Sequence, residues 1–437
     1  MLNDNRGVKT CQTITSIFIS LMLSVFILIC SQYTHITEIK YYAFLLLCGS
    51  YIVAITITMC VYRKEPFPID RKLTFIVLVY LVCTAISVIT SPYEYDCWTG
   101  LSRHEGIITQ TIYCFLLIYV SAFGQIKKTH LYLLGATITV FSVICIIQFF
   151  GGNPLHLYPD GYDYYDKGVK YPGEFLGTVG NAGFVSTLLA MSSAVFFSKL
   201  LTDKRTRTIW FILFLLSTGV LFFAKVAAGI LGLAASVMIT LPIVFKNKRK
   251  QIIIAEILMI TALLMTLYFY DIGSGTVHEF HEVLHGRISE NFGSGRIKIW
   301  REVLSKIPEH LFFGTGPDTM LAWDIEGFSK QVNNITVYRH IDVAHNEYLN
   351  VLAQQGLFAV LCCFALIGYA CQRFIKTKSK EELVVPASAA VAYGAQAVFG
   401  ITSCIITPIF IIFFAALCKG GKKYGFERKP RRSDVVA

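Results

Sequence analysis

Long apolar runs alternate with shorter polar segments along the whole chain. Most of these runs hold about 20 residues with few or no charges, which is the length that an α-helix needs to cross a hydrocarbon core of about 30 Å. The pattern predicts an all-α fold, a polytopic transmembrane helical bundle that forms a single integral membrane domain over residues 1–437. We expect about twelve spans, at residues 12–31, 41–62, 73–91, 106–124, 131–150, 182–201, 208–224, 226–245, 252–270, 347–371, 384–402 and 404–418.

Two polar segments are much longer than the other connections. Residues 271–346 lie between the ninth and tenth expected spans, and residues 151–181 lie between the fifth and sixth. Long polar loops between regular elements are usually functional. We therefore predict that residues 271–346 form a large extracytoplasmic catalytic loop and residues 151–181 a second extracytoplasmic loop. Tyrosines at 158–171 in the second loop suit either stacking on sugar rings or an aromatic belt at the membrane surface.

Composition and charge agree with a membrane protein and predict its orientation. Hydrophobic residues make up 54% of the chain and charged residues 15%, with a mean hydropathy of +0.58, whereas a soluble domain holds about 25% charged residues. The net charge is +11. The lysines and arginines of the chain concentrate in every second connection between the expected spans, including residues 204–207 and 246–250. By the positive-inside rule, both termini are cytoplasmic in a multi-pass protein of the cytoplasmic (inner) membrane. The basic tail, 419–437, suits anchoring to anionic membrane lipid, and no nucleic acid is expected as a partner.

One histidine lies where the longer loop turns into an apolar run. His345 stands within the sequence Asp342-Val343-Ala344-His345-Asn346-Glu347. Imidazole titrates near neutral pH, so His345 is a candidate general base, and Asp342 or Glu347 is close enough in sequence to orient it. A histidine at the start of a helix also serves as a capping or surface residue.

A short amphipathic pattern precedes this histidine. Residues 296–307 carry an apolar face, and Ser294 and Gly295 before them suit a helix start. This helix either lies on the bilayer with its charges reaching out, or it holds Arg296 at its N-terminus facing a phosphate. The glycine-rich stretch from Phe313 to Asp318 suits a tight turn and is weak evidence for a phosphate loop. The apolar face comprises Ile297, Trp300, Val303, Leu304 and Ile307.

Two further cations lie on the predicted outer side. Lys225 falls between two apolar runs, and Arg103 falls in a short polar loop. A charge between apolar runs is unfavourable unless it reaches the membrane surface or a partner. Each cation therefore either extends to the interface or faces a lipid-linked anion.

A metal-site pattern competes with this interpretation. Residues 281–285 read His-Glu-Val-Leu-His and match H-E-x-x-H, which places two histidines on one helical face to bind zinc. His278 is a possible third ligand. Gly286 follows at once, so the helix is short and stands within a loop, and we predict no metal at this site.

Taken together, these residues resemble the O-antigen ligase/O-antigen polymerase superfamily, membrane glycosyltransferases that use glycans linked to undecaprenyl pyrophosphate. The resemblance covers about residues 98–414 and is most specific from Arg296 to Gly356. The matching segments, in chain order, are Gly177-Thr178-Val179-Gly180-Asn181, Ala224-Lys225 with Gly229, Ser294-Gly295-Arg296 with Trp300, Phe313-Gly314-Thr315-Gly316, and Ala344-His345-Asn346-Glu347-Tyr348-Leu349.

The resemblance implies a role for each matched position. His345 would activate the acceptor hydroxyl, with Glu347 beside it, and Arg296 and Lys225 would hold the pyrophosphate. Lys225 stands where the family has an arginine, and a lysine gives a point charge rather than a planar fork. Arg103 matches a family arginine less closely. No cofactor is implied.

The resemblance implies an O-antigen ligase-like glycosyltransferase of surface polysaccharide biosynthesis in the cell envelope. It would move a glycan from undecaprenyl pyrophosphate to a glycan, lipid or protein acceptor at the outer face of the cytoplasmic membrane, without a metal ion. Alternatives in the same class are an O-antigen or capsule repeat-unit polymerase and a protein O-oligosaccharyltransferase. An alternative from another class is a glycan flippase or transporter. A transporter would line its pathway with charged residues inside the spans, but Glu256 is the only clear carboxylate inside an expected span and the charge lies in the outer loops instead.

Overall fold

The computed structural model describes residues 5–93, 96–157, 176–271, 273, 275–290, 292–323, 325–332, 335–378 and 380–419. The tyrosines predicted at 158–171 and nearly all of the basic tail lie outside the described residues. The α-helices are α1 (Arg6–Met22), α2 (Val25–Leu28), α3 (Ile36–Val61), α4 (Arg71–Ile89), α5 (Asp96–Thr99), α6 (Ile107–Phe123), α7 (Lys128–Phe149), α8 (Ala182–Thr202), α9 (Arg207–Phe223), α10 (Ala227–Val244), α11 (Arg249–Phe269), α12 (Gly275–Leu284), α13 (Phe292–Lys306), α14 (Glu347–Lys376), α15 (Glu381–Gln396) and α16 (Thr407–Lys419).

Each expected span coincides with a helix of the described structure. Eight candidate spans there are long and apolar enough to cross a membrane. The helices α6, α9 and α16 are apolar but shorter, so the number of twelve spans stays a prediction. A chain of such helices satisfies its backbone hydrogen bonds internally, as lipid requires. We therefore describe a multi-pass helical membrane protein.

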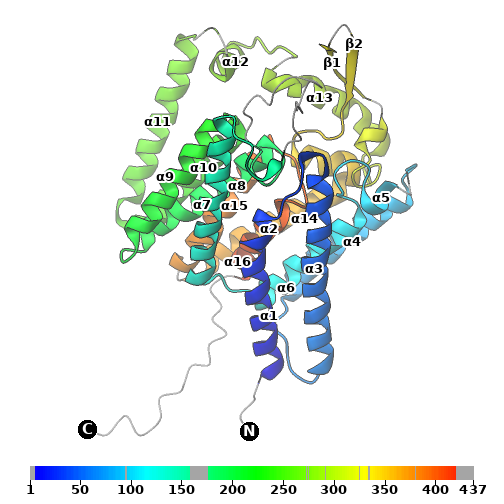
Figure 1. The fold of residues 1–437 in the computed structure, drawn as a ribbon, viewed down its shortest axis with the longest axis vertical. Coiled ribbons are helices and arrows are strands. Elements are labelled where there is room, and N and C mark those ends of the chain that lie inside the picture. The colour runs from blue at the N-terminus through cyan, green and yellow to red at the C-terminus, as the bar shows by residue number, and fades with distance from the viewer. Residues whose placement is uncertain are drawn as a thin grey trace.

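The helices pack around α8, which is the most deeply buried of the candidate spans. It contacts α9, α10 and α15, and small residues such as Ser193 and Ser198 on α8 allow close approach. The hydroxyl of Ser198 donates to Ser388 on α15 at 2.6 Å. By contrast, α11 contains no buried residue and lies at the edge of the bundle beside α10 (Figure 1).

The polar loop covers one end of the bundle. Figure 1 shows α12, α13 and a β-hairpin there, at the end opposite the start of α1. The hairpin pairs β1 (Glu326–Val332) with antiparallel β2 (Ile335–His340), and it departs from the all-α prediction. Short 3₁₀ turns complete the described fold: η1 (Tyr33–His35), η2 (Pro154–His156), η3 (Lys246–Lys248), η4 (Ile307–His310) and η5 (Met320–Trp323).

The polar loop has a small hydrophobic core of its own. Ile299 and Val303 on α13 and Ile307 at the start of η4 are buried against Met320 and Trp323. This set differs from the predicted apolar face, because Leu304 is 53% exposed. The helix α13 therefore packs within the loop. The prediction missed this because the loop core is assembled from segments distant in sequence.

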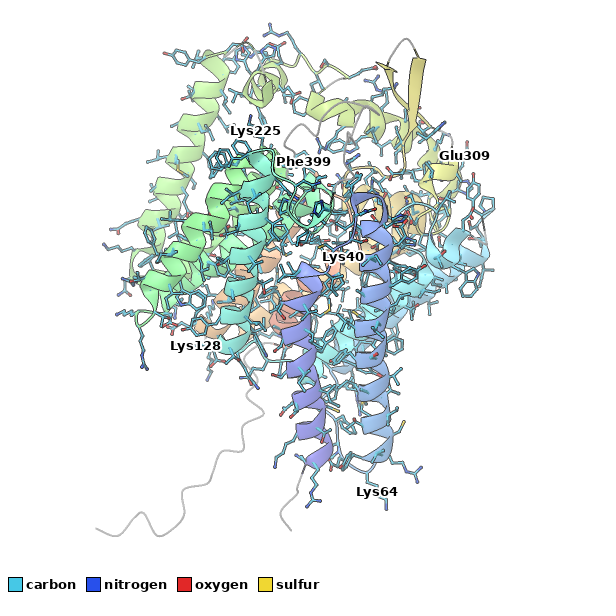
Figure 2. All side chains as sticks on the ribbon, viewed as in Figure 1. Lys40, Lys64, Lys128, Lys225, Glu309 and Phe399 are labelled. Atoms are coloured by element: carbon cyan, nitrogen blue, oxygen red, sulfur yellow. The ribbon has the colours of Figure 1, made fainter. Side chains whose placement is uncertain are left out.

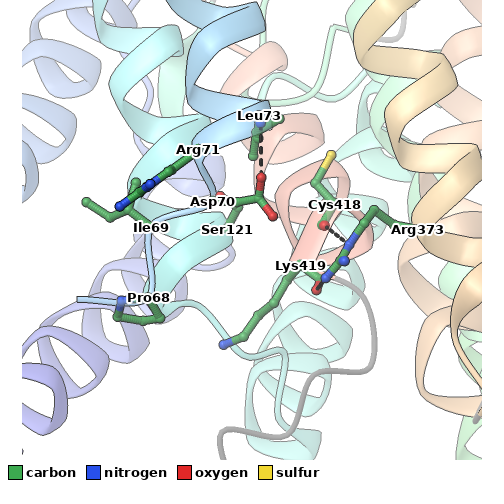
Figure 3. Close-up of a pocket in the computed structure, with 9 residues that line it drawn as sticks. All are labelled: Pro68, Ile69, Asp70, Arg71, Leu73, Ser121, Arg373, Cys418 and Lys419. Atoms are coloured by element: carbon green, nitrogen blue, oxygen red, sulfur yellow. Dashed lines mark hydrogen bonds between the residues drawn. The ribbon is translucent and has the colours of Figure 1, made fainter. Parts of the chain in front are cut away.

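Charged residues tie helix ends together at the opposite end of the bundle. A cavity of about 300 Å³ lies among the ends of α4, α6, α14 and α16 (Figure 3). The guanidinium of Arg373 donates to the last carbonyl oxygens of α16, at Cys418 and Lys419. The carboxylate of Asp70 accepts from backbone N–H groups in the first turn of α4. These contacts satisfy backbone groups that helix ends leave free.

Candidate active site

His345 lies in a short segment that runs from the hairpin to α14. Val343 and Ala344 before it are buried, and the indole Nε1 of Trp300 on α13 donates to the carbonyl oxygen of Ala344 at 2.8 Å. The side chain of Asn346 caps α14 by accepting from the backbone N–H of Leu349 at 3.0 Å. The backbone of His345 is left-handed, with φ 49°, a conformation that a non-glycine residue adopts only when its surroundings impose it. The imidazole is therefore held between a buried anchor and a helix cap.

Arg296 opens the regular part of α13. Gly293 and Gly295 before it have φ values of 61° and 84°, which are outside the helical range and suit glycine. The guanidinium of Arg296 donates to the carbonyl oxygens of Gly293 and, at 3.4 Å, of Phe399. Its Nε is shielded from solvent and has no hydrogen-bond partner in the described part of the chain. The predicted position at a helix start therefore agrees with the structure.

Arg103 reaches the same segment from the loop between α5 and α6. Its guanidinium forms an ion pair with Asp342 at 2.7 Å, and the two side chains are 22% and 28% exposed. Like Arg296, Arg103 has a buried Nε that forms no hydrogen bond with any described group. A cation from the first third of the chain therefore lies beside the histidine segment.

The charges of both arginines act on His345. The pKa of His345 is lowered to about 4, first by burial and then by the cations of Arg296 and Arg103, with Asp342 opposing them. Burial also lowers the pKa of Arg296, although an arginine remains charged at any physiological pH. The imidazole is therefore neutral at neutral pH, with a lone pair that can accept a proton, and it lies in a positive field that favours an anion beside it.

Two predicted partners of His345 are engaged elsewhere. The carboxylate of Asp342 accepts from Arg103, and that of Glu347 accepts from the Tyr393 hydroxyl at 2.9 Å. Within the described residues, neither carboxylate bonds to the imidazole. Glu347 begins α14, and its backbone N–H donates to Ala397. It thus joins α14 to α15, while one of its oxygens, Oε1, is buried without a partner in the described structure.

Lys225 is exposed in the turn between α9 and α10. Its backbone is left-handed, with φ 55°, and Figure 2 shows it at the same end of the bundle as Phe399, whose carbonyl oxygen accepts from Arg296. The charges that shift the pKa of His345 are those of Arg296, Arg103 and Asp342, and Lys225 is not among them. The structure therefore brings three of the predicted residues together and leaves Lys225 on a neighbouring turn.

The H-E-x-x-H histidines are used in local contacts. Nδ1 of His281 lies 2.8 Å from the carbonyl oxygen of Leu267, and Nδ1 of His285 lies 2.8 Å from that of His281. Glu282 forms an ion pair with Arg287 at 2.6 Å. The three potential ligands that do approach one another are Asp271, His278 and Glu282, with atoms within 4.8 Å. This grouping differs from the one that the motif predicts.

Sequence reasoning missed the role of the glycine-rich turn at 313–318. Gly314 and Gly316 fit tightly against the backbone of α14 and against Cys97, so that a Cβ at either position would lie 2.3 Å or less from a neighbouring atom. The carboxylate of Asp318 in this turn binds the backbone around Arg103. The glycines signalled the turn, but nothing in the sequence linked Asp318 to residues 102–105.

Comparison with known proteins agrees with the sequence motifs. The family model described as O-Antigen ligase matches residues 212–364, a region that contains Lys225, Arg296 and His345 and leaves Arg103 outside. The curated proteins include no match to the chain. The family match indicates a membrane glycosyltransferase of the O-antigen ligase or polymerase type. It confirms the predicted resemblance to the O-antigen ligase superfamily over residues 212–364.

Proposed function

We propose that the protein transfers a glycan from undecaprenyl pyrophosphate to an acceptor hydroxyl at the outer face of the cytoplasmic membrane. The observation that carries the proposal is the convergence of two arginines from separate segments on one neutral histidine. Both guanidinium groups keep a buried Nε without a partner in the described structure. Buried donors are normally satisfied, so these atoms favour an anionic ligand at this position.

The reaction follows from the chemistry of these groups. The acceptor hydroxyl oxygen attacks the anomeric carbon of the donor sugar, and its proton passes to the imidazole of His345. The bond from the anomeric carbon to the pyrophosphate oxygen breaks, and its electron pair leaves with undecaprenyl pyrophosphate. Arg296 and Arg103 stabilise the charge that develops on this leaving group, and a single such donor is worth roughly 3 kcal/mol. The energy of the reaction comes from the donor itself.

The remaining predicted residues act from further away in this proposal. Lys225, exposed at the same end of the bundle, adds positive charge that attracts the donor headgroup. Glu347 holds the start of α14 against α15 through Tyr393, and so supports the segment that carries His345. A direct attack inverts the configuration at the anomeric carbon. Product of retained configuration would exclude the single-step version.

The test is glycan transfer by purified protein from an undecaprenyl-pyrophosphate-linked donor, followed by mass spectrometry of the product. We expect His345→Ala and Arg296→Ala each to lower kcat/KM on the order of 100-fold. Arg301→Ala is the matched control, because Arg301 is 62% exposed on the same helix and pairs with Glu290. Full activity in both site variants would disprove the assignment.

The same assay separates the alternatives. His281→Ala retains activity here, whereas a zinc enzyme built on residues 281–285 would lose it. A flippase would move the lipid-linked glycan without breaking its bond to pyrophosphate, so recovery of only intact donor would favour transport. Offering lipid-linked repeats, a lipid acceptor and a peptide acceptor in parallel distinguishes polymerase, ligase and protein glycosylation by the product that forms.

A further inference from the structure

The buried carboxylate of Asp318 accepts several hydrogen bonds from the backbone around Arg103. Asp318 is 2% exposed. Its Oδ2 accepts from the backbone N–H groups of Arg103 at 2.7 Å, Glu105 at 3.2 Å and Ser102 at 3.3 Å. Its Oδ1 accepts from the Ser102 hydroxyl at 2.8 Å. A buried carboxylate is unfavourable unless it is well hydrogen-bonded, and here four donors from one turn meet that need.

The backbone of Asp318 is tied to the histidine segment. Its N–H donates to Oε1 of Gln354 on α14 at 2.9 Å, and the same oxygen accepts from Nδ2 of Asn350 at 3.3 Å. Oδ1 of Asn350 then accepts from the N–H of Ala344 at 3.3 Å. A continuous chain of hydrogen bonds therefore leads from the Arg103 turn, through Asp318, to the residue beside His345.

The surroundings of Asp318 allow it little freedom. A Cβ on Gly100 would lie 2.2 Å from its Oδ2, and the backbone of Asp318 is left-handed, with φ 59°. The backbone N–H of Leu101 also donates to the carbonyl oxygen of Asp318 at 3.1 Å. Gly100 therefore lets the carboxylate approach the turn closely, and Asp318 links the two segments through its side chain and its backbone.

We propose that Asp318 is a positioning residue, which fixes the cation of Arg103 at the site of His345 by accepting hydrogen bonds from residues 102–105. The expected loss of kcat/KM rests on the proposed function, whereas the position of Arg103 does not. Asp318 touches no substrate in this account. It acts through Arg103, and the family match does not assign it.

The chemistry of the turn gives a sharp choice of variants. In Asp318→Asn the amide oxygen accepts from the three backbone N–H groups, and the amide NH₂ faces the Ser102 hydroxyl, which can also accept. In Asp318→Ala all four acceptor contacts are lost. We therefore expect Asp318→Asn to retain activity within about threefold of the wild type, and Asp318→Ala to lower kcat/KM for the lipid-linked donor by about 100-fold, as a displaced group does.

A double-mutant cycle tests whether the loss passes through Arg103. In the Arg103→Ala background, adding Asp318→Ala should change kcat/KM by less than about threefold, because residues in one network are not additive. A full further 100-fold loss would show that Asp318 acts independently and would overturn the proposal. Equal losses in Asp318→Asn and Asp318→Ala would overturn it too, because the charge and not the hydrogen bonds would then matter.

A second measurement requires no glycan transfer and so separates this proposal from the proposed function. Phenylglyoxal modifies accessible arginines, and the rate at Arg103 can be followed by mass spectrometry of the purified protein. We expect faster modification of Arg103 in Asp318→Ala and the wild-type rate in Asp318→Asn, with Arg301 as the internal reference. An unchanged rate in Asp318→Ala would disprove the positioning role.

If the Asp318→Ala protein does not accumulate, Ser102→Ala is the second variant, because it removes one of the four contacts to the carboxylate. It should raise the rate of Arg103 modification, and an unchanged rate there counts equally against the proposal.

Discussion

Arg103 and Arg296 differ in how their charge is balanced, although both act on the same histidine. Arg103 is paired with Asp342 at 2.7 Å, whereas the described contacts of Arg296 are to carbonyl oxygens. Carbonyl contacts leave the full positive charge available to a ligand. Arg296 is therefore the stronger anion-binding group of the two, and Arg103 must share its charge with a carboxylate.

This difference predicts the outcome of a conservative substitution. Arg296→Lys keeps the charge but loses the planar fork that bonds Gly293 and Phe399. We expect kcat/KM to fall by about tenfold, less than in Arg296→Ala, because a lysine binds phosphate as a point charge. Arg301→Lys on the exposed side of α13 serves as the control. A lysine variant as inactive as the alanine variant would mean that the fork geometry, and not the charge, is required.

The lowered pKa of His345 predicts an unusual pH dependence. Burial and the two arginines lower this pKa from the ordinary value of 6.5 to about 4, so the imidazole of the free enzyme is mostly neutral at pH 5 and above. kcat/KM should stay level from pH 7 to about pH 5 and fall as the pH approaches 4. A bound pyrophosphate offsets both cations and raises the pKa of His345, so the acid limb of kcat should lie at higher pH than that of kcat/KM. A kcat/KM limb at pH 6.5 or above would contradict this account.

At the scale of elements, two glycines hold the loop on α14. Gly356 interrupts the helix with φ 83° and ψ 179°, and a Cβ there would lie 2.2 Å from the carbonyl oxygen of Phe312. The broken turn lets the N–H of Leu357 donate to the carbonyl oxygen of Leu311, and lets the carbonyl oxygen of Gln354 accept from Gly316 at 2.8 Å. The interruption in α14 is thus where the glycine-rich turn docks.

Substitution of Gly356 should separate the loop from the bundle. In Gly356→Ala the backbone conformation, with φ 83° and ψ 179°, is one that essentially only glycine adopts and costs roughly 1–3 kcal/mol, and the contact with Phe312 adds to it. We expect a lower midpoint of thermal unfolding in detergent and a loss of transfer activity. Gly368→Ala is the matched control, since Gly368 lies in the same helix with nothing within 4 Å of a Cβ, and alanine favours a helix by up to about 1 kcal/mol. Equal midpoints for the two variants would contradict the docking role.

Hydrophobic patterning predicted the helices well but could not predict the architecture of the loop. Each expected span coincides with a helix because a run of apolar residues is a local signal. The partners of Asp318 are far away in sequence, at residues 102–105 and 354, and no local pattern encodes such pairings. Arg296 and His345 were found through short motifs, whereas the ion pair of Arg103 with Asp342 was not. The site was predictable as a set of residue types and not as a geometry.

At the scale of the whole molecule, charge is divided between two ends. The candidate site lies beneath the polar loop, where Glu309 is found, and Lys64 lies at the other end of the bundle (Figure 2). At this second end Arg373 and Asp70 form hydrogen bonds to the backbone of helix ends (Figure 3). The positive-inside rule predicts that this second end is cytoplasmic. The loop and the site would then face the compartment from which a lipid-linked glycan is transferred.

Cysteine labelling tests this orientation directly. We expect a membrane-impermeant maleimide to label Glu309→Cys in intact wall-free cells and to label Lys64→Cys only after the membrane is opened. The wild-type protein sets the background, because its thirteen cysteines lie mostly within the bundle. The reverse pattern would place His345 on the cytoplasmic side, where the proposed transfer to an outer acceptor could not occur. Labelling of both positions in intact cells would instead indicate an even number of spans between residues 64 and 309, since two sites on one side of the membrane require an even number. The helices α4 and α6–α11 lie between these residues, and they make seven spans if each one crosses. The seven-span count therefore predicts opposite sides, and the accessibility of these two positions tests the shorter helices α6 and α9 as true spans.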